Sequence, residues 1–333
     1  MEWIKNMSIT GGAAFGAALI LSVLLGFVLL PILRHFKLGQ PIKAEALAWH
    51  KTKEGTPTMG GLSFVTAFLL CTAGYAVFLG VKGRGRELIP FALVVLFAVG
   101  NSAIGFIDDY CKLIRKSNDG LSALQKLLLQ LVLTGAFIAM MRATGNLETA
   151  MRLPFADDKW IELSWFAYPV YLIVITGFIN ATNLTDGIDG LASSVCAVEC
   201  AFIVLYCFIK GDTDVCVLSA ALLGCMIGFL VFNHNPAQMF MGDTGSLVLG
   251  GVLMGCAVMT GELLLFLLAG FVFVIDMLTS LLQTASYKLR HKRIFPIAPI
   301  HHSFERWGWS ENQIVALFAG VTLLLCVAAY FGI

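Results

Sequence analysis

The sequence has few charged residues: Asp, Glu, Lys and Arg make up 13% of its 333 residues, against about a quarter in an average soluble domain. Its nine cysteines include no Cys-x-x-Cys pair, and no Cys/His set has zinc spacing, which argues against a zinc site. There is no Gly-Lys-Ser/Thr P-loop and no Gly-x-Gly-x-x-Gly segment, so a bound nucleotide would need another architecture. A formal net charge of +1 gives no indication of a nucleic-acid partner.

The sequence is rich in long apolar runs, and 58% of its residues are hydrophobic. Runs of about 20 residues match the thickness of a bilayer, and these runs lack the alternation of a membrane β-barrel. The first run is too long for a signal-peptide core and is interpreted as an uncleaved span. We predict an all-α integral membrane protein with about ten transmembrane helices. They form one polytopic domain over residues 1–333, with spans near 12–32, 59–80, 89–107, 123–141, 165–181, 191–209, 215–232, 245–260, 262–287 and 312–332.

The basic residues predict which way the loops face. The five odd-numbered loops between the predicted spans carry most of the Lys and Arg residues. By the positive-inside rule, these loops lie in the cytoplasm and both termini are extracytoplasmic. The segment from Lys82 to Arg86 is an exception, because its basic residues fall on the outer side.

Polar residues that could do chemistry gather in the same five loops, within residues 50–61, 106–110, 180–190, 233–246 and 299–305. This topology would bring all five segments to one cytoplasmic mouth. The sequence therefore predicts a single active site built from the five cytoplasmic loops.

Five acids stand out in these loops: Asp108, Asp109, Asp186, Asp189 and Asp243. Charge at membrane depth costs about 2.5–3.5 kcal/mol on insertion scales, so clusters there rarely occur without a partner or a function. For the last three acids, helix N-capping is an equally good explanation when each is taken alone. The first two are expected at the C-terminal end of a span, where the helix dipole disfavours anions. The group as a whole favours function.

Carboxylates without cysteine or an HExxH pair indicate a hard cation, Mg²⁺ rather than zinc. Magnesium binds one or two protein carboxylates and leaves its other positions to phosphates and water. The turn at residues 242–245 could offer backbone N–H groups to phosphate oxygens. Positive charge could come from Lys53, Lys126, His301 and His302.

Other candidates have equally good structural explanations. Asn183 and Asn233 could orient a base or sugar, or cap helices. Phe240 could stack on a nucleobase, although packing is the commoner role of a lone aromatic residue. Glu199 and Asp276 fall inside predicted spans, where helix–helix hydrogen bonding or a subunit contact is as good an explanation as function.

Five ordered segments carry a family resemblance: Gly-Thr-Pro-Thr-Met-Gly-Gly (55–61), Phe-Ile-Asp-Asp-Tyr (106–110), Asn-Ala-Thr-Asn-Leu-Thr-Asp-Gly-Ile-Asp-Gly-Leu-Ala (180–192), Phe-Met-Gly-Asp-Thr-Gly-Ser-Leu (240–247) and Ala-Pro-Ile-His-His-Ser-Phe-Glu (298–305). Together they resemble the phospho-N-acetylmuramoyl-pentapeptide transferases (the MraY type), a branch of the polyprenyl-phosphate N-acetylhexosamine-1-phosphate transferases. The resemblance implies transfer from UDP-MurNAc-pentapeptide to undecaprenyl phosphate, which gives lipid I and UMP in peptidoglycan synthesis. It also implies ten spans, a homodimer, and an active site facing the cytoplasm in a bacterial plasma membrane.

The resemblance also implies roles for particular residues. Asp243 would coordinate magnesium, and Asp108 would deprotonate or orient the lipid phosphate with Asp109 beside it. Lys126 and His302 would contact phosphates, so that the catalytic set is Asp108, Asp109, Asp243 and His302. The uridine side of the pocket would comprise Asn183, Gly187, Ile188, Asp189 and Phe240, and the remaining polar lining Lys53, Thr58, Asp186, Asn233, Gln283 and His301.

The chain departs from the family pattern at two positions. Ser303 stands where the family usually has a third consecutive histidine, which weakens any mechanism that needs all three. Lys43 replaces the usual arginine and keeps the charge without the bidentate geometry.

Two other functions remain open from the sequence. A sister transferase would use another UDP-N-acetylhexosamine, and the first-loop segment argues against it. A transporter would place its charges near the membrane midplane, often in repeated halves, whereas these acids crowd one face. The sequence also leaves open whether the transfer takes one step or passes through a covalent aspartyl-phosphate.

Overall fold

The computed structural model describes residues 2–35, 53, 55–115, 119–156 and 159–333. Within these ranges, nine helices are long and apolar enough to cross a membrane, or ten if the bent pair α9–α10 counts as one span. The fold is therefore that of an all-α multi-span membrane protein, as predicted. The helices are α1 (Glu2–His35), α2 (Gly61–Val81), α3 (Gly85–Arg115), α4 (Ala123–Ala143), α5 (Ala167–Thr185), α6 (Leu191–Lys210), α7 (Thr213–Asn233), α8 (Gly242–Thr260), α9 (Leu263–Ala269), α10 (Phe271–Arg290), α11 (Ile300–Arg306) and α12 (Glu311–Tyr330).

Two predicted boundaries were wrong. Helix α1 begins at Glu2 rather than near residue 12. Helix α3 continues to Arg115 rather than ending near residue 107, and its last turn is basic, which suits the negative end of the helix dipole. Asp108 and Asp109 therefore lie inside α3, about two turns before its end, and the helix-end argument for them fails.

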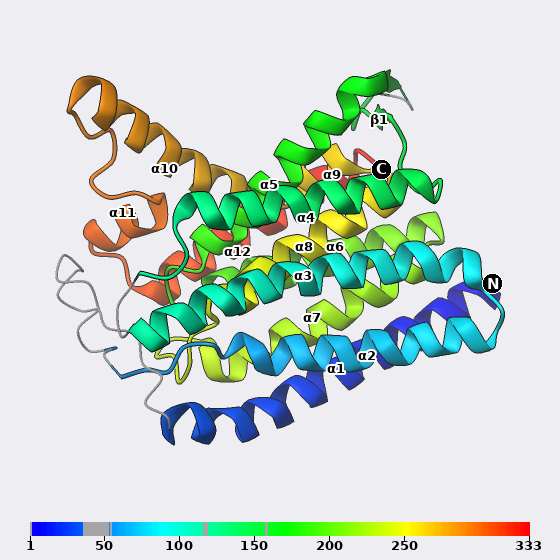
Figure 1. Cartoon of the computed structure of the whole chain (residues 1–333), viewed down its shortest axis with the longest axis horizontal. Coiled ribbons are helices and arrows are strands. Elements are labelled where there is room, and N and C mark those ends of the chain that lie inside the picture. The colour runs from blue at the N-terminus through cyan, green and yellow to red at the C-terminus, as the bar shows by residue number, and fades with distance from the viewer. Residues whose placement is uncertain (1, 36–52, 54, 116–118, 157–158) are drawn as a thin grey trace.

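The predicted ninth span is broken. It divides at Gly270 into α9 and α10, which are bent by 78° relative to each other. Two small elements were not predicted: α11, and an antiparallel pair of strands, β1 (Ala150–Arg152) and β2 (Trp160–Glu162). In Figure 1, α10 projects away from the bundle, and α11 lies below its outer end.

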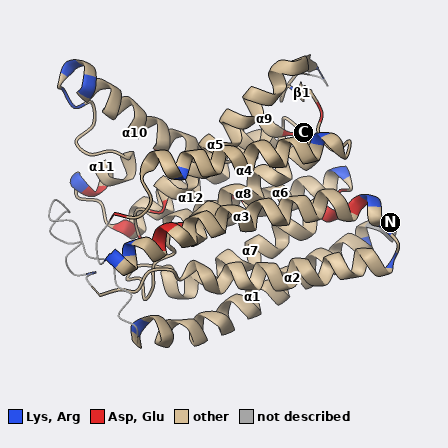
Figure 2. Cartoon of the chain, viewed as in Figure 1, with Lys and Arg blue, Asp and Glu red and all other residues tan. Residues whose placement is uncertain are grey.

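Charged residues gather towards the two ends of the bundle, and the middle of most helices carries none (Figure 2). Both chain termini lie at one end, together with the strand pair (Figure 1). The C-terminal ends of α3 and α10 lie at the other end, with α11 (Figure 1). This distribution is the one expected of helices that cross an apolar layer.

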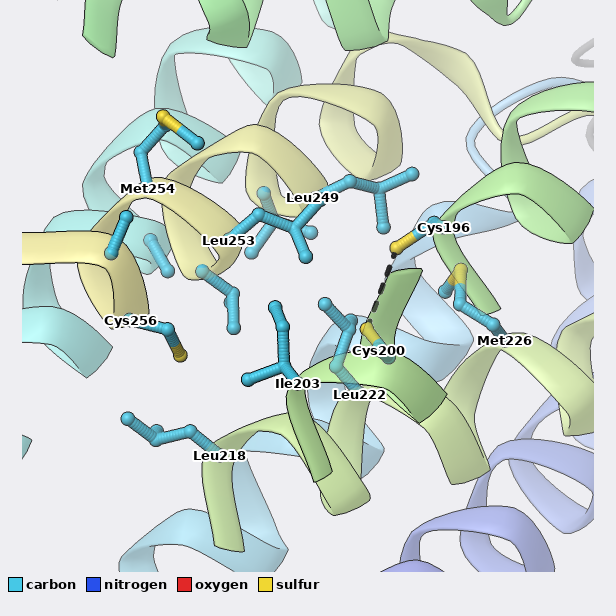
Figure 3. Packing of buried hydrophobic residues seen from close by; sticks show 14 of the residues in the cluster. Cys196, Cys200, Ile203, Leu218, Leu222, Met226, Leu249, Leu253, Met254 and Cys256 are labelled. Atoms are coloured by element: carbon cyan, nitrogen blue, oxygen red, sulfur yellow. Dashed lines mark hydrogen bonds between the residues drawn. The ribbon is translucent and has the colours of Figure 1, made fainter. Parts of the chain in front are cut away.

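Helix α8 is the central element. In its apolar stretch of 18 residues, 83% of the residues are buried, compared with 28% in the corresponding stretch of α1. Its Leu249 and Leu253 pack towards Ile203 of α6 and Leu222 of α7 (Figure 3). A helix enclosed on all sides needs small residues where its neighbours approach. A Cβ on Gly61 of α2 would lie 2.5 Å from the Cα of Gly245 in α8.

Gly105 of α3 makes the tightest of these approaches, because a Cβ there would overlap the backbone carbonyl of Asp243. Gly105→Ala should therefore force α3 away from α8 and lower the stability by about 1–3 kcal/mol, the usual cost of overpacking. The measurement is the apparent melting temperature in detergent. Gly74→Ala in α2 is the matched control, since a Cβ at Gly74 meets nothing within 4 Å. Equal melting temperatures for the two variants would contradict the close packing.

Candidate active site

Three acids converge where the start of α8 meets α3. One carboxylate oxygen each from Asp108, Asp109 and Asp243 can be chosen so that all lie within 4.8 Å of one another. Asp109 is fully buried and accepts hydrogen bonds from the backbone N–H of Thr244 (2.9 Å), the hydroxyl of Thr244 (2.7 Å) and the N–H of Asp243 (3.2 Å). Asp109 thus satisfies the free N–H groups at the start of α8 and fixes where Asp243 points.

Two lysines partly neutralise this acid cluster. The Nζ of Lys112 lies 2.6 Å from Oδ2 of Asp108, 3.1 Å from Oδ2 of Asp243 and 3.8 Å from Oδ1 of Asp109. Lys126 of α4 lies 2.7 Å from the same Oδ2 of Asp243. Lys112 was not among the predicted site residues. Its spacing of four residues from Asp108 would have indicated it, had α3 been predicted to its full length.

The segment from Asn183 to Asp189, here called the 183–189 turn, adjoins the acid cluster. Asn183 accepts a hydrogen bond from Lys126 (3.0 Å) and donates one to Oδ1 of Asp243 (2.8 Å). Burial, together with the nearby charges of Asp243, Asp109 and Asp189, raises the pKa of Asp186 well above its usual value. The N-capping alternative fails for Asp189 and Asp243, because the N-cap residues of α6 and α8 are Gly190 and Met241, and neither helix has a side-chain cap.

The same turn meets the histidines of α11. A Cβ on Gly187 would collide with Nε2 of His301 and would lie 3.3 Å from Nε2 of His302. The other ring nitrogens face acids: His301 Nδ1 lies 2.7 Å from Asp276, and His302 Nδ1 lies 2.6 Å from Glu305. The structure therefore gives Asp276, which the sequence left without a role, a defined partner.

Ser303 turns away from this turn. Its hydroxyl donates to the carbonyl of Ile297 (2.5 Å) and accepts from the N–H of the same residue (3.3 Å). The serine is fully buried and supports the chain before α11. The side chains that contact Gly187 are His301 and His302. The other departure, Lys43, lies outside the described residues.

Lys53 reaches the far end of the 183–189 turn. Its Nζ lies 2.7 Å from Asp189 and 2.6 Å from Glu311, at the start of α12. Asp189 also accepts hydrogen bonds from the side chain of Asn235 (3.1 Å) and the N–H of Ala237 (2.9 Å). Glu311 was missed, because nothing local in the sequence connects it to a loop more than a hundred residues away.

Other predicted residues support the backbone around the site. Asn233 is buried, accepts from the N–H of Gly190 (3.2 Å) and donates to the carbonyl of Met239 (3.3 Å). Gln283 holds the segment after α10 by accepting from the N–H groups of Ile294 (2.9 Å) and Phe295 (3.0 Å).

Three more predicted residues lie close to the start of α8 or to the 183–189 turn. The backbone of Phe240 pairs with Pro57 and Gly60, and its side chain is partly exposed. Thr58 is buried beside Gly242, and Ile188 is buried within the turn.

The acid cluster fits a hard divalent cation, since its donor atoms are all carboxylate oxygens close enough to share an ion. Both carboxylate oxygens of Asp109 already accept hydrogen bonds from the first turn of α8. Asp108 and Asp243 have oxygens that face the lysines. Lysine cations beside such a site are suited to the oxygens of a phosphorylated substrate.

These features define a membrane-embedded transferase, and residues 91–261 match the model of glycosyl transferase family 4. The chain is 39% identical over 317 residues to the phospho-N-acetylmuramoyl-pentapeptide-transferase of Clostridium kluyveri, covering 95% of this chain and 97% of that one. It is 38% identical over 313 residues to the enzyme of the same name from Bacillus subtilis, covering 94% of each chain. The chain belongs to the phospho-N-acetylmuramoyl-pentapeptide-transferase family.

Gly187 gives a test of the contact between the turn and α11. Gly187→Ala should displace the His301 ring and lower transferase turnover by about tenfold or more, the range seen when catalytic groups are misplaced by about 1 Å. Because His301 is buried, the melting temperature is measured as well, and turnover should fall by more than any loss of folded protein explains. Turnover is compared with that of Gly74→Ala. Normal turnover in Gly187→Ala would contradict the close approach of the turn and the histidines.

Proposed function

We propose that the protein transfers phospho-MurNAc-pentapeptide from UDP-MurNAc-pentapeptide to undecaprenyl phosphate, which gives lipid I and UMP. The observation that carries this proposal is the cluster of three carboxylates and two lysines at one end of the bundle. The names of the relatives support the same donor and product class. A phosphoryl transfer needs positioning and charge neutralisation more than covalent chemistry from the protein.

We assign the cation to Mg²⁺, held by Asp243 with Asp108 beside it. When bound, it would neutralise charge on the diphosphate of the donor. Lys126 and Lys112 would bind the remaining phosphate oxygens, since both already lie against Asp243. Asp109 acts in this proposal by holding the start of α8, because its own oxygens are engaged there.

The proposed reaction is a direct displacement. An oxygen of undecaprenyl phosphate, oriented or deprotonated by Asp108, bonds to the β-phosphorus of the donor. The bond between that phosphorus and the bridging oxygen breaks, and UMP leaves. A two-step route through an aspartyl-phosphate would differ in forming a covalent enzyme–phosphosugar, which rapid quenching with labelled donor would trap.

The rest of the pocket is assigned to the donor. Asn183, Gly187, Ile188 and Asp189 would bind the uridine, and Phe240 would stack on the uracil ring. The remaining polar lining would be Lys53, Thr58, Asp186, Asn233, Gln283, His301 and His302. The basic odd-numbered loops support a site that faces the cytoplasm of a bacterial membrane. We also propose that the chain forms a single domain and assembles as a homodimer.

Release of UMP by purified protein in detergent tests the reaction. We expect release only when UDP-MurNAc-pentapeptide, undecaprenyl phosphate and Mg²⁺ are all present. Turnover of UDP-GlcNAc instead would move the protein to a sister branch of the superfamily. If no donor leads to release of UMP, the transferase assignment is rejected.

Two substitutions test the acid cluster. Asp108→Asn and Asp243→Asn should each lower turnover about a hundredfold or more, because each removes charge from the reacting centre. Asp214→Asn is the matched control: Asp214 is also buried, and it bonds to Tyr75 at the other end of the bundle. Melting temperatures establish that the variants fold. Near-normal turnover in both site variants would reject the assignment.

Lys112 provides a test in which two readouts move in opposite directions. Its Nζ pairs with the carboxylates that would bind a cation. Lys112→Gln should therefore bind Mn²⁺ about tenfold more tightly, a gain of about 1.4 kcal/mol, while turnover falls about tenfold or more. Mn²⁺ binding is measured by electron paramagnetic resonance. Arg115→Gln is the control, since among the described residues the hydrogen bonds of Arg115 go to the backbone carbonyls of Asp119 and Gly120. Weaker Mn²⁺ binding in Lys112→Gln would contradict the inference that the Lys112 ammonium group and the cation compete for the same carboxylates.

A further inference from the structure

Asp276 of α10 is buried and has no part in the reaction proposed above. Its Oδ2 lies 2.7 Å from Nδ1 of His301, and both residues have no exposed surface. A carboxylate accepts hydrogen bonds, so Nδ1 carries the hydrogen that lies between them. The contact thereby fixes the orientation of the ring and places a proton on Nδ1, the ring nitrogen that faces α10.

The second nitrogen of the ring faces the active site. Nε2 of His301 is buried and has no hydrogen-bond partner within the part of the chain that the structure describes. It lies against Gly187, where a Cβ would collide with it. A buried polar atom without a partner costs about 1–3 kcal/mol, so a partner in the working enzyme would offset that cost.

The 183–189 turn connects this nitrogen to the acid cluster. Asn183 of the turn bonds directly to Asp243, and Gly187 lies four residues further along the chain. A substrate that contacts Asp243 and extends along the turn therefore passes beside Nε2. A phosphorylated, hydroxyl-rich donor has the oxygens to meet it.

Docking of α11 on α10 does not depend on Asp276 alone. The hydroxyl of Thr279 accepts from the N–H of Ile300 (3.0 Å) and donates to the carbonyl of Asp276 (2.7 Å). Gln283 holds the intervening segment one turn further along α10. The Oδ1 of Asp276 also accepts from the backbone N–H of His301 (3.4 Å), so Asp276 contributes to this docking. Its Oδ2 makes the separate contact with the imidazole.

We propose that Asp276 is a positioning residue, which holds His301 so that Nε2 contacts an oxygen of the UDP-linked donor beside Gly187. This inference rests on the proposed function, and it adds a residue on the broken ninth span to the site. The donor, not the lipid phosphate, is the assigned partner, because the 183–189 turn is the segment to which the uridine is assigned.

The first measurement is the steady-state kinetics of Asp276→Asn. The amide keeps the volume but can present its NH₂ group to Nδ1, which allows the other tautomer. We expect kcat to fall about 100–10,000-fold, the scale of losses when a general acid–base group or its orienting carboxylate is disturbed. The KM for the donor should change less than about threefold, and Asp276→Glu should recover most of the activity.

A double-mutant cycle separates positioning from a structural role. If Asp276 acts only through His301, then Asp276→Asn should lower the turnover of His301→Gln protein by less than about twofold. Losses that multiply would overturn the proposal. Glu199→Gln is the matched control, since Glu199 of α6 is an equally buried carboxylate whose oxygens have no hydrogen-bond partner among the residues that the structure describes. Its turnover should stay within about twofold of the unmodified protein.

The outcomes distinguish this inference from the proposed function. If the unmodified protein releases no UMP, the proposed function itself fails. If it is active and Asp276→Asn has unchanged kcat, only the role of Asp276 is overturned. Should Asp276→Asn not fold, the cycle is run with Asp276→Glu. Any loss it causes should vanish in the His301→Gln protein, and a loss that persists there overturns the proposal.

Discussion

The arrangement of the site depends on one buried carboxylate. Asp109 of α3 accepts three hydrogen bonds from the first turn of α8 and is fully buried. A helix start enclosed by protein would otherwise leave N–H groups without partners. The contact draws α8 so close to α3 that residue 105 has to be glycine to avoid the carbonyl of Asp243. The position of Asp243 is therefore set by a bond between two helices, not by its own loop.

Charge balance follows from this geometry. Asp108, Asp109 and Asp243 face Lys112 and Lys126, so three carboxylates meet two ammonium groups and one negative charge remains. Burying unpaired charge is costly, whereas paired and hydrogen-bonded charge is tolerated. A divalent cation and a diphosphate can enter such a site without leaving a large net charge. The 183–189 turn then connects the cluster to the two histidines at one point and to Lys53 at another.

Much of the fold could be predicted from the sequence, because a membrane span needs about 20 apolar residues whatever its neighbours are. The prediction failed where a helix outlasts its apolar stretch, as α3 does through Arg115, and where a span breaks, as at Gly270. Local composition does not report either feature. Polar residues can continue a helix beyond the bilayer. The bend at Gly270 lies where the chain packs against Glu199 of α6, because a Cβ at residue 270 would meet the Glu199 carboxylate.

The residues of the candidate site could also be predicted only in part. Loop acids and histidines were predicted from their residue types, and the structure brings Asp108, Asp109, Asp243 and Lys126 together. The partners Glu311 and Asp276 were not assigned, because each meets its loop only through the tertiary fold. Asp109 was predicted as a catalytic residue, whereas its contacts indicate that it positions α8.

The central claim is that one cation is shared between Asp243 and the diphosphate of the donor. The most direct measurement is the position of Mn²⁺, located by anomalous scattering, in crystals of the protein with UDP-MurNAc-pentapeptide. The account predicts one Mn²⁺ in contact with Asp243 and the diphosphate, with the uridine along the 183–189 turn. A cation bound away from Asp243, or a donor bound away from this turn, would contradict it.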